Sequence, residues 1–298
     1  MLRIVQVTDT HVPARPDAPT VLEVLAGIES GDPVAHLDLV IADIDALDPR
    51  PDLLVGTGDL ADAGDPAAYR RWRERFLPLR IPVWALPGNH DLADVLDEHL
   101  AGAGADGVGV DVGVAARTGD WLLLFVRTGN TEWGEIDPVH VDAVRAELAA
   151  SDAAHVFVWM HHPPVGQHLA AHETLVRDDL RAALAGDPRV RGIAAGHVHV
   201  AAELDLDGVP VYLTPSTYTG RPGPGYRVVD LHDDGRVITE VRTVPTQFTF
   251  DAEQRDRLLA MSMERFAHEP EARRGAHDAA RAEVERWREA TTRGRVRR

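Results

Sequence analysis

The chain has 298 residues, 44% of them apolar, and a formal net charge of −17. This composition allows a large core in one big domain or two small ones, and the absence of cysteine excludes disulfides and thiolate metal ligands. The negative charge argues against binding a nucleic-acid polymer through its phosphates. No apolar run reaches the roughly 20 residues of a membrane span, and no secretory signal pattern is present, so we expect a cytoplasmic protein.

Short apolar runs alternate with amphipathic stretches over the first two thirds of the chain. The runs have the length and composition of buried strands; they cover residues 4–7, 53–55, 83–86, 121–126, 156–160 and 193–195. Helical spacing of apolar side chains marks residues 35–47, residues 66–77 and the segment that Asp137-Pro138 opens. The alternation predicts an α/β fold.

The last part of the chain has a different character. Residues 209–213, 226–231 and 237–241 are predicted to be short strands, and we expect them to extend one edge of a sheet. From residue 251 onward the sequence is helical in propensity. We therefore divide the chain into a main domain, residues 1–246, and a helical C-terminal extension, residues 247–298. The extension is either an exposed helix with a frayed end or a packing or oligomer-forming arm, which leaves a homodimer open.

Five polar motifs each follow a predicted strand. They are Asp9-Thr10-His11, Gly58-Asp59-Leu60-Ala61-Asp62, Gly88-Asn89-His90-Asp91, Met160-His161-His162-Pro163-Pro164 and Gly196-His197-Val198-His199. Ligands bind beyond the carboxyl ends of strands in an open α/β sheet, so these residues can converge. In an extended chain, residues i and i+2 point to the same side, which lets Asp9 and His11 chelate an ion together, as His197 and His199 can. The preceding glycines allow sharp turns or close packing beside the ligands.

Each motif alone has an ordinary explanation, such as a turn at Gly58-Asp59 or an exposed strand pair at His197 and His199. All five in this order, each at a strand end, indicate a site for two metal ions. Mixed Asp, His and Asn ligands suit Mn, Fe or Zn better than Mg or Ca. Among these we favour Fe and Mn.

Together the motifs resemble those of the calcineurin-like metallophosphoesterases: D-x-H, GD-x-x-D, GNH-D/E, a histidine after a strand, and GH-x-H. The resemblance extends from about residue 1 to residue 244. It implies a four-layer α/β/β/α sandwich in which helices flank two mixed sheets, with residues 1–246 as the catalytic domain. It also implies a ligand set. One ion would be held by Asp9, His11, Asp59 and His199. The second would share Asp59 and be held also by Asn89, His161 and His197.

By the same resemblance, His90 is the catalytic histidine that contacts the phosphoryl group or protonates the leaving oxygen. We interpret Asp62 as the acid that orients His90. Asp91 is a second candidate for that role, or a turn residue that caps a helix starting near Leu92. Candidate substrate contacts are His162, Arg15 and His168. For Arg15 and His168 the ordinary explanation, which we prefer, is a solvated surface residue.

The resemblance implies a metal-dependent phosphoric ester hydrolase. Residues 4–91 look most like the bacterial class III cyclic nucleotide phosphodiesterases and their glycerophosphodiesterase relatives, whereas Ala63-Gly64 stands where protein phosphatases have Arg-Gly. We expect attack of a metal-activated hydroxide on the phosphorus of a small phosphodiester, 3′,5′-cyclic AMP or a similar cyclic nucleotide. The alternatives are a glycerophosphodiesterase, a nucleotidase or a phosphomonoesterase. A non-catalytic scaffold would lack ligands or His90, and this chain lacks neither.

Overall fold

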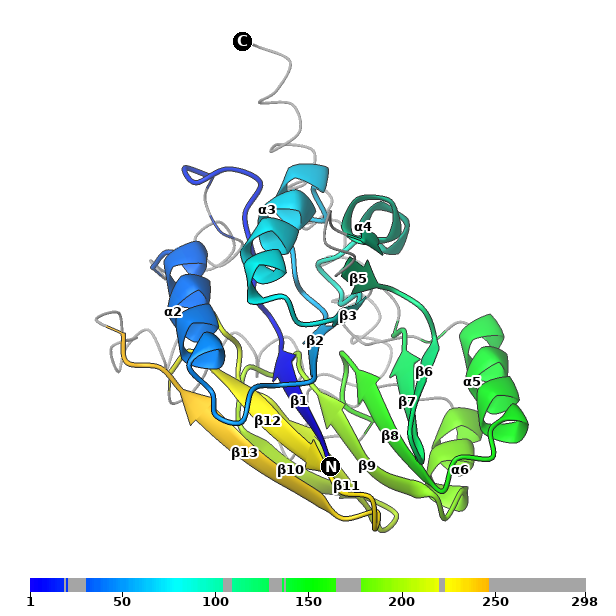
Figure 1. The fold of residues 1–298 in the computed structure, drawn as a ribbon. Coiled ribbons are helices and arrows are strands. Elements are labelled where there is room, and N and C mark those ends of the chain that lie inside the picture. Colours follow the sequence, from blue (N-terminus) through cyan, green and yellow to red (C-terminus); the bar gives the residue numbers. More distant parts are fainter. Residues whose placement is uncertain are drawn as a thin grey trace, which may run out of the picture.

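The computed structural model describes residues 1–18, 20, 31–103, 109–128, 136, 138–164, 178–219 and 223–246. Within these residues two mixed β-sheets pack face to face, and helices cover their outer faces (Figure 1). This arrangement confirms the expected α/β/β/α class. The expected helical extension, residues 247–298, and His168 lie outside the described residues.

The first sheet has a parallel centre and antiparallel edges. Its described strands are, in spatial order, β13 (Val237–Thr243), β12 (Gly225–Leu231), β1 (Leu2–Val7), β2 (Leu53–Thr57), β3 (Val83–Leu86), β5 (Gly109–Asp111) and β4 (Gly102–Ala103). Strands β1, β2, β3 and β5 run parallel. Their carboxyl ends therefore meet along one edge of the sheet.

The second sheet is built in the same way. As far as the structure describes the chain, its order is β10 (Ala202–Leu206), β11 (Val209–Leu213), β9 (Val190–Ala195), β8 (His155–Met160), β7 (Trp121–Val126) and β6 (Ala115–Thr118). The expectation that residues 209–213, 226–231 and 237–241 extend one edge of a single sheet is wrong. Strand β11 joins this sheet beside β9, whereas β12 and β13 extend the first sheet beyond β1. The inner faces of both sheets are apolar. The sequence of a short apolar strand therefore does not indicate which of the two sheets it joins.

Helices form the outer layers. The first sheet packs against α2 (Pro33–Asp45), α3 (Pro66–Phe76) and α4 (Ala93–Leu100), and the second against α5 (Pro138–Ala150) and α6 (Asp178–Gly186). Helix α3 begins as expected: the Asp65 side chain accepts a hydrogen bond from the Ala67 amide, and Pro66 occupies the first helical position. Helix α2 begins in the same way at Asp32 and Pro33, two residues before its predicted start.

Central strands such as β7 and β8 are buried on both faces, and alternate side chains enter different cores. In β7, Leu122, Leu124 and Val126 pack toward α5 and α6, whereas Trp121, Leu123 and Phe125 enter the layer between the sheets. There the Phe125 ring stacks on Trp84 of β3, with 4.3 Å between ring centroids and 10° between planes. This inter-sheet core fixes how far apart the two sets of strand ends lie.

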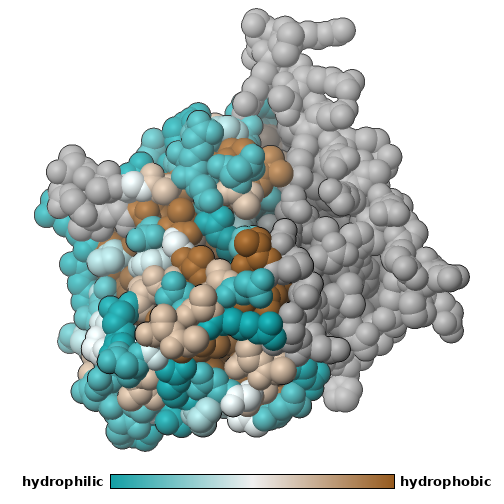
Figure 2. Space-filling view, turned by 90° about the vertical axis from the view of Figure 1, so that its right-hand side faces the viewer, coloured by the Kyte–Doolittle hydropathy of each residue, from teal (hydrophilic) through white to brown (hydrophobic). Residues whose placement is uncertain are grey.

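On the surface formed by the described residues, exposed large apolar side chains are scattered. Among the residues whose placement is described, large apolar side chains are exposed at Met1, Leu39, Val139 and Ile238, which belong to four different segments. On the face shown in Figure 2, apolar residues are interspersed with hydrophilic ones. In the described part of the chain, no helix combines the length and apolar character that crossing a membrane requires.

The inter-sheet core gives the first prediction. Phe125 is 1% exposed, so Phe125→Ala leaves a cavity between the sheets and should lower the free energy of unfolding by about 3–5 kcal/mol. Urea denaturation followed by far-UV circular dichroism measures the change. Val139→Ala is the control, because Val139 is 62% exposed and its truncation should change stability by at most about 0.5 kcal/mol. Equal losses in the two variants would contradict the assignment of Phe125 to this core.

Candidate metal centre

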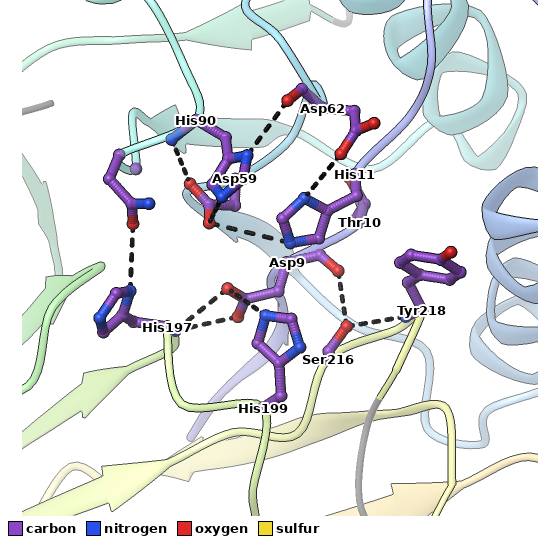
Figure 3. Close-up of polar contacts among 12 residues, drawn as sticks. Asp9, Thr10, His11, Asp59, Asp62, His90, His197, His199, Ser216 and Tyr218 are labelled. Atoms are coloured by element: carbon purple, nitrogen blue, oxygen red, sulfur yellow. Dashed lines mark hydrogen bonds and ion pairs between the residues drawn. The ribbon is translucent and has the colours of Figure 1, made fainter. Parts of the chain in front are cut away.

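The expected metal ligands meet where the parallel strands of both sheets end. Figure 3 shows five of them: Asp9, His11, Asp59, His197 and His199. From the first sheet, Asp9 and His11 follow β1, Asp59 follows β2 and Asn89 follows β3. From the second, His161 follows β8, and His197 and His199 follow β9. The centre therefore lies across the two sheets, and each sheet contributes part of the ligand set.

Several of these residues share an unusual backbone conformation. Positive φ angles occur at Asp9 (52°), His11 (45°), Asp59 (50°), His197 (69°) and His199 (56°). A left-handed conformation is uncommon outside glycine and costs on the order of 1–3 kcal/mol where the surroundings impose it. The pairs at 9/11 and 197/199 are therefore brought together by left-handed turns rather than by the extended chain assumed from the sequence.

Glycines allow the loops to approach one another, as their positions before the ligands predicted. Gly58 has a φ of 87°, and a Cβ there would lie 2.5 Å from Nδ1 of His161. A Cβ at Gly88 would lie 2.8 Å from Cε1 of the same ring and would also overlap Asp59. Any larger residue at these positions would push the ligand side chains apart.

The first group of donor atoms contains Asp9, His11 and His199, whose ligand atoms lie within 4.8 Å of one another. Nε2 of His199 is 3.2 Å from Oδ1 of Asp9. Asp59 approaches this group, because its Oδ2 lies 3.8 Å from Nε2 of His11. Carboxylate oxygens and imidazole nitrogens face one another here, as in a mixed oxygen and nitrogen metal site.

The second group contains Asn89, His161 and His197. Oδ1 of Asn89 lies 3.1 Å from Nε2 of His161 and 3.0 Å from Nδ1 of His197. His161 uses Nδ1–H to donate to the Thr57 carbonyl at 2.9 Å. In the neutral ring, Nε2 then presents a lone pair toward Oδ2 of Asp59, 3.5 Å away. Facing lone pairs require a proton or a cation between them, so these residues fit a metal ion.

Electrostatics point to the same need for positive charge. Burial lowers the pKa of His161, but the charge of Asp59 and its hydrogen bond outweigh burial and raise the pKa to about 9. Burial also lowers the pKa of His11, and the hydrogen bond with Asp62 and the nearby carboxylates raise it to about 9. The pKa of Asp59 lies well below its usual range, because the charges of His161 and His90 outweigh the opposing effect of burial.

Asp59 lies between the two groups. Its Oδ2 faces His11 at 3.8 Å and His161 at 3.5 Å, so one carboxylate reaches both sets of ligands. Its Oδ1 accepts a hydrogen bond from the His90 amide at 2.8 Å. This position suits the bridging role that the sequence implied.

His90 and Asp62 meet differently from the expected carboxylate–imidazole pair. Nδ1 of His90 lies 3.1 Å from the main-chain oxygen of Asp62, which orients the ring. The Asp62 carboxylate instead lies 3.3 Å from Nδ1 of His11. The reason is a pairing of the two loops: Val12 bridges to Ala61, and the Asp62 amide donates to the Val12 carbonyl at 3.1 Å. This pairing places the Asp62 side chain next to His11.

Asp91 does not cap α4. The N-cap residue of that helix is Leu92, which forms no side-chain capping bond. The Asp91 carboxylate is fully buried and accepts hydrogen bonds from Leu60, Ala61 and Gly88. The sequence reading of Asp91 as a helix cap is therefore wrong.

The structure places the substrate candidates in different surroundings. His162 is 1% exposed, its ring centroid lies 4.4 Å from that of His197, and its Nδ1 lies 2.6 Å from the Thr128 hydroxyl. The ring therefore faces His161 and His197, two of the expected ligands, rather than solvent. Arg15 is half-exposed, with its Nε 3.7 Å from a carboxylate oxygen of Asp17 in the same loop.

Sequence reasoning missed a set of hydroxyl residues that supports the ligands. The Ser216 hydroxyl donates to the main-chain oxygen of Asp9 at 2.7 Å and accepts from the amides of Tyr218 and Thr219. The Thr219 hydroxyl contacts Nδ1 of His199. The sequence held one signal for them: a run of Ser and Thr directly after the predicted strand 209–213, at the same edge as the ligands.

The raised pKa values predict a pH dependence for the metal-free protein. His11 and His161 bind protons more tightly when folded, with a pKa of about 9 against 6.5, so their contribution to stability is complete below pH 6.5. It is lost as the pH rises toward 9. We expect the urea midpoint of metal-free protein to fall across this window and the Mn-loaded protein to lose less, because the metal replaces the protons.

The matched variant for this measurement is His11→Gln. It removes one of the two titrating groups, and the slope of stability against pH should fall by roughly half. If the metal-free protein becomes more stable between pH 6.5 and 9, the raised pKa values of His11 and His161 are contradicted.

Comparisons with known proteins identify the family to which the chain belongs. The family model described as calcineurin-like phosphoesterase matches residues 2–201. The chain is 30% identical to the 3′,5′-cyclic adenosine monophosphate phosphodiesterase CpdA of Escherichia coli K12, over 84% of this chain and 93% of that protein. It is also 32% identical to the cAMP/cGMP dual specificity phosphodiesterase of Mycobacterium tuberculosis, over 56% of this chain and 55% of that protein.

Solved structures share the fold. The protein TT1561 of Thermus thermophilus matches with a TM-score of 0.53 and 13% identity, over 80% of this chain and 98% of that chain. The purple acid phosphatase PPD1 from yellow lupin matches with a TM-score of 0.54 and 12% identity, over 81% of this chain and 51% of that chain. At these identities the likeness establishes the architecture alone.

Proposed function

The chain belongs to the calcineurin-like phosphoesterase family, and on that premise we propose that this metal-dependent phosphodiesterase hydrolyses 3′,5′-cyclic AMP or a similar cyclic nucleotide. The observation that carries the proposal is the convergence of two donor groups on Asp59 with His90 beside them. The choice of substrate is supported by the relatives: CpdA of Escherichia coli, which matches most of this chain, is a 3′,5′-cyclic AMP phosphodiesterase.

We assign the ligands as the two donor groups suggest. The first ion is assigned to Asp9, His11, Asp59 and His199, and the second to Asp59, Asn89, His161 and His197. When bound, two divalent ions supply Lewis-acid stabilisation of phosphoryl oxygens and lower the pKa of water. Mixed oxygen and nitrogen donors without thiolates favour Mn, Fe or Zn, and we favour Fe and Mn.

His90 can act on the substrate from the side of Asp59. Its Nδ1 is held by the Asp62 main-chain oxygen, so Nε2 points into the centre, 3.9 Å from Oδ2 of Asp59. The ring is partly open to solvent, with a side-chain exposure of 15%. In the imidazolium form Nε2–H can donate to a phosphoryl oxygen, or give its proton to the leaving alkoxide as the P–O bond breaks.

Asp62 links the two halves of this arrangement. Its main-chain oxygen orients His90, and its carboxylate orients His11 through Nδ1. A carboxylate behind a ligating histidine fixes the tautomer and raises the basicity of the other nitrogen. The His162 ring packs against the rings of His161 and His197, and we assign it the role of positioning these two ligands.

The substrate assignment is tested by comparing diesters. We expect Mn-reconstituted protein to show a higher kcat/KM on 3′,5′-cyclic AMP than on a glycerophosphodiester, because the chain resembles cyclic nucleotide phosphodiesterases over most of its length. Preference for the glycerophosphodiester would refute the substrate while leaving the metal centre intact. Turnover only of monoesters would refute the diester class.

The role of His90 is tested by His90→Ala. The variant should keep two Mn ions per chain, measured by elemental analysis, and lose about 10²–10⁴-fold in kcat, because a positioned proton donor contributes this much. His99→Ala is the matched control, since His99 lies on α4 beside Glu98, away from the proposed ligands. Full turnover in His90→Ala would remove His90 from the mechanism.

A further inference from the structure

The carboxylate of Asp91 is the centre of a buried hydrogen-bond cluster. Its Oδ2 accepts from the Leu60 amide at 3.1 Å and from the Gly88 amide at 2.9 Å. Its Oδ1 accepts from the Ala61 amide at 3.1 Å and from the Tyr69 hydroxyl at 3.0 Å. The side chain has no exposure to solvent. Both oxygens are therefore used fully, each by two donors.

These donors come from the two loops that hold the centre of the site. Leu60 and Ala61 directly follow Asp59 in the loop between β2 and α3. Gly88 directly precedes Asn89 and His90 in the loop between β3 and α4. One side chain therefore connects the loop of the proposed bridging ligand with the loop that carries a ligand of the second ion and the proposed proton donor.

Tyr69 extends the cluster into the helix layer. Its hydroxyl donates to Asp91 and accepts from the Leu92 amide at 3.1 Å, and its ring is fully buried in α3. The cluster is thus anchored to a helix as well as to the two loops. A buried carboxylate of this kind is tolerated because four donors replace the water that it has lost.

The β2–α3 and β3–α4 loops are in direct contact, so their spacing determines the position of Asp59. The His90 amide donates to Oδ1 of Asp59 at 2.8 Å, and the Gly88 backbone leaves no room for a Cβ beside Asp59. A small displacement of either loop would therefore change how Asp59 sits relative to Asn89 and His90. Asp91 supplies three of the amide contacts that oppose such a displacement.

We propose that Asp91 is a positioning residue of the metal centre, whose carboxylate fixes the β2–α3 loop against the β3–α4 loop and so sets the spacing between Asp59 and the Asn89–His90 pair. The proposal rests on the ligand roles assigned above. It gives the acid that ends the Gly-Asn-His-Asp motif a task distinct from orienting His90, which the Asp62 main chain performs. This role also differs from capping α4, whose N-cap residue is Leu92.

The test is Asp91→Asn, which keeps the size of the side chain but turns one acceptor oxygen into an amide that faces N–H donors. Asp94→Asn is the matched control, because Asp94 is an exposed acid in the first turn of α4. Turnover is measured on bis(p-nitrophenyl) phosphate, a diester that does not depend on the natural substrate. Mn(II) binding is measured by calorimetry, and the spin-coupled Mn pair by electron paramagnetic resonance.

We expect Asp91→Asn to fold and to lose about 10–100-fold in kcat or in affinity for the second Mn ion, as loss of a residue behind metal ligands does. The coupled Mn signal should weaken, KM should stay near that of the wild type, and Asp94→Asn should match the wild type throughout. A lower melting temperature together with an unchanged kcat and an unchanged coupled signal would overturn the proposal, because it would show a purely structural role.

Tyr69→Phe decides the matter if Asp91→Asn does not fold. It removes one of the four donors to Asp91 and keeps the three amide bonds, so kcat and the coupled signal should fall below those of the wild type, by less than about 10-fold. A Tyr69→Phe protein with a native coupled signal and native kcat would then overturn the proposal. Wild-type protein without a coupled Mn pair would overturn the ligand assignment itself, and the proposal with it, before any variant is compared.

Discussion

Two buried carboxylates, Asp9 and Asp59, are the constraint on which the rest of the centre depends. Asp9 has no exposure and Asp59 has 2%, so neither can be stabilised by bulk water. Buried charges persist only when they are paired, hydrogen-bonded or bound to metal. The negative charge of the carboxylates raises the pKa values of His11 and His161. The same negative charge attracts divalent cations.

The sandwich architecture turns this local requirement into a site. Each sheet brings its parallel strands to a common edge, and the ligand set is divided between the two edges. The distance between the two halves is therefore set by the core between the sheets, where Trp84 stacks on Phe125. Packing far from the site thus contributes to the spacing of the proposed ligands, because close-packed interiors transmit strain.

Around the ligands, a layer of residues holds the turns that bear them. Ser216 secures the turn at Asp9, and Thr219 contacts His199. Asp62 serves two residues at once, His90 through its main chain and His11 through its carboxylate. Left-handed backbone at the ligands has an energetic cost, and these contacts are what hold the strained turns in place.

The sequence by itself determined most of the long elements and which residues are the candidates for the site. The β1, β2, β3, β7, β8 and β9 strands and the α2, α3 and α5 helices follow from local periodicity, and the motif residues follow those strands directly. Local patterns suffice for these features because a parallel strand carries its functional residues at its own carboxyl end. The strands β4, β5, β6 and β10 were not predicted. Strands β4 and β5 have only two and three residues, and β6 and β10 lack the continuous apolar run that marks the predicted strands.

Only the tertiary structure decided which segments support one another. The hydrogen bond from Ser216 to Asp9 spans 207 residues, and the one from Leu60 to Asp91 spans 31. The tertiary structure also decided that β11 pairs with β9 and that the Asp62 carboxylate lies beside His11. A sequence pattern records what a residue can donate, accept or bury. Its partner is decided by which backbone comes within about 3 Å when the layers pack, and that depends on the whole fold.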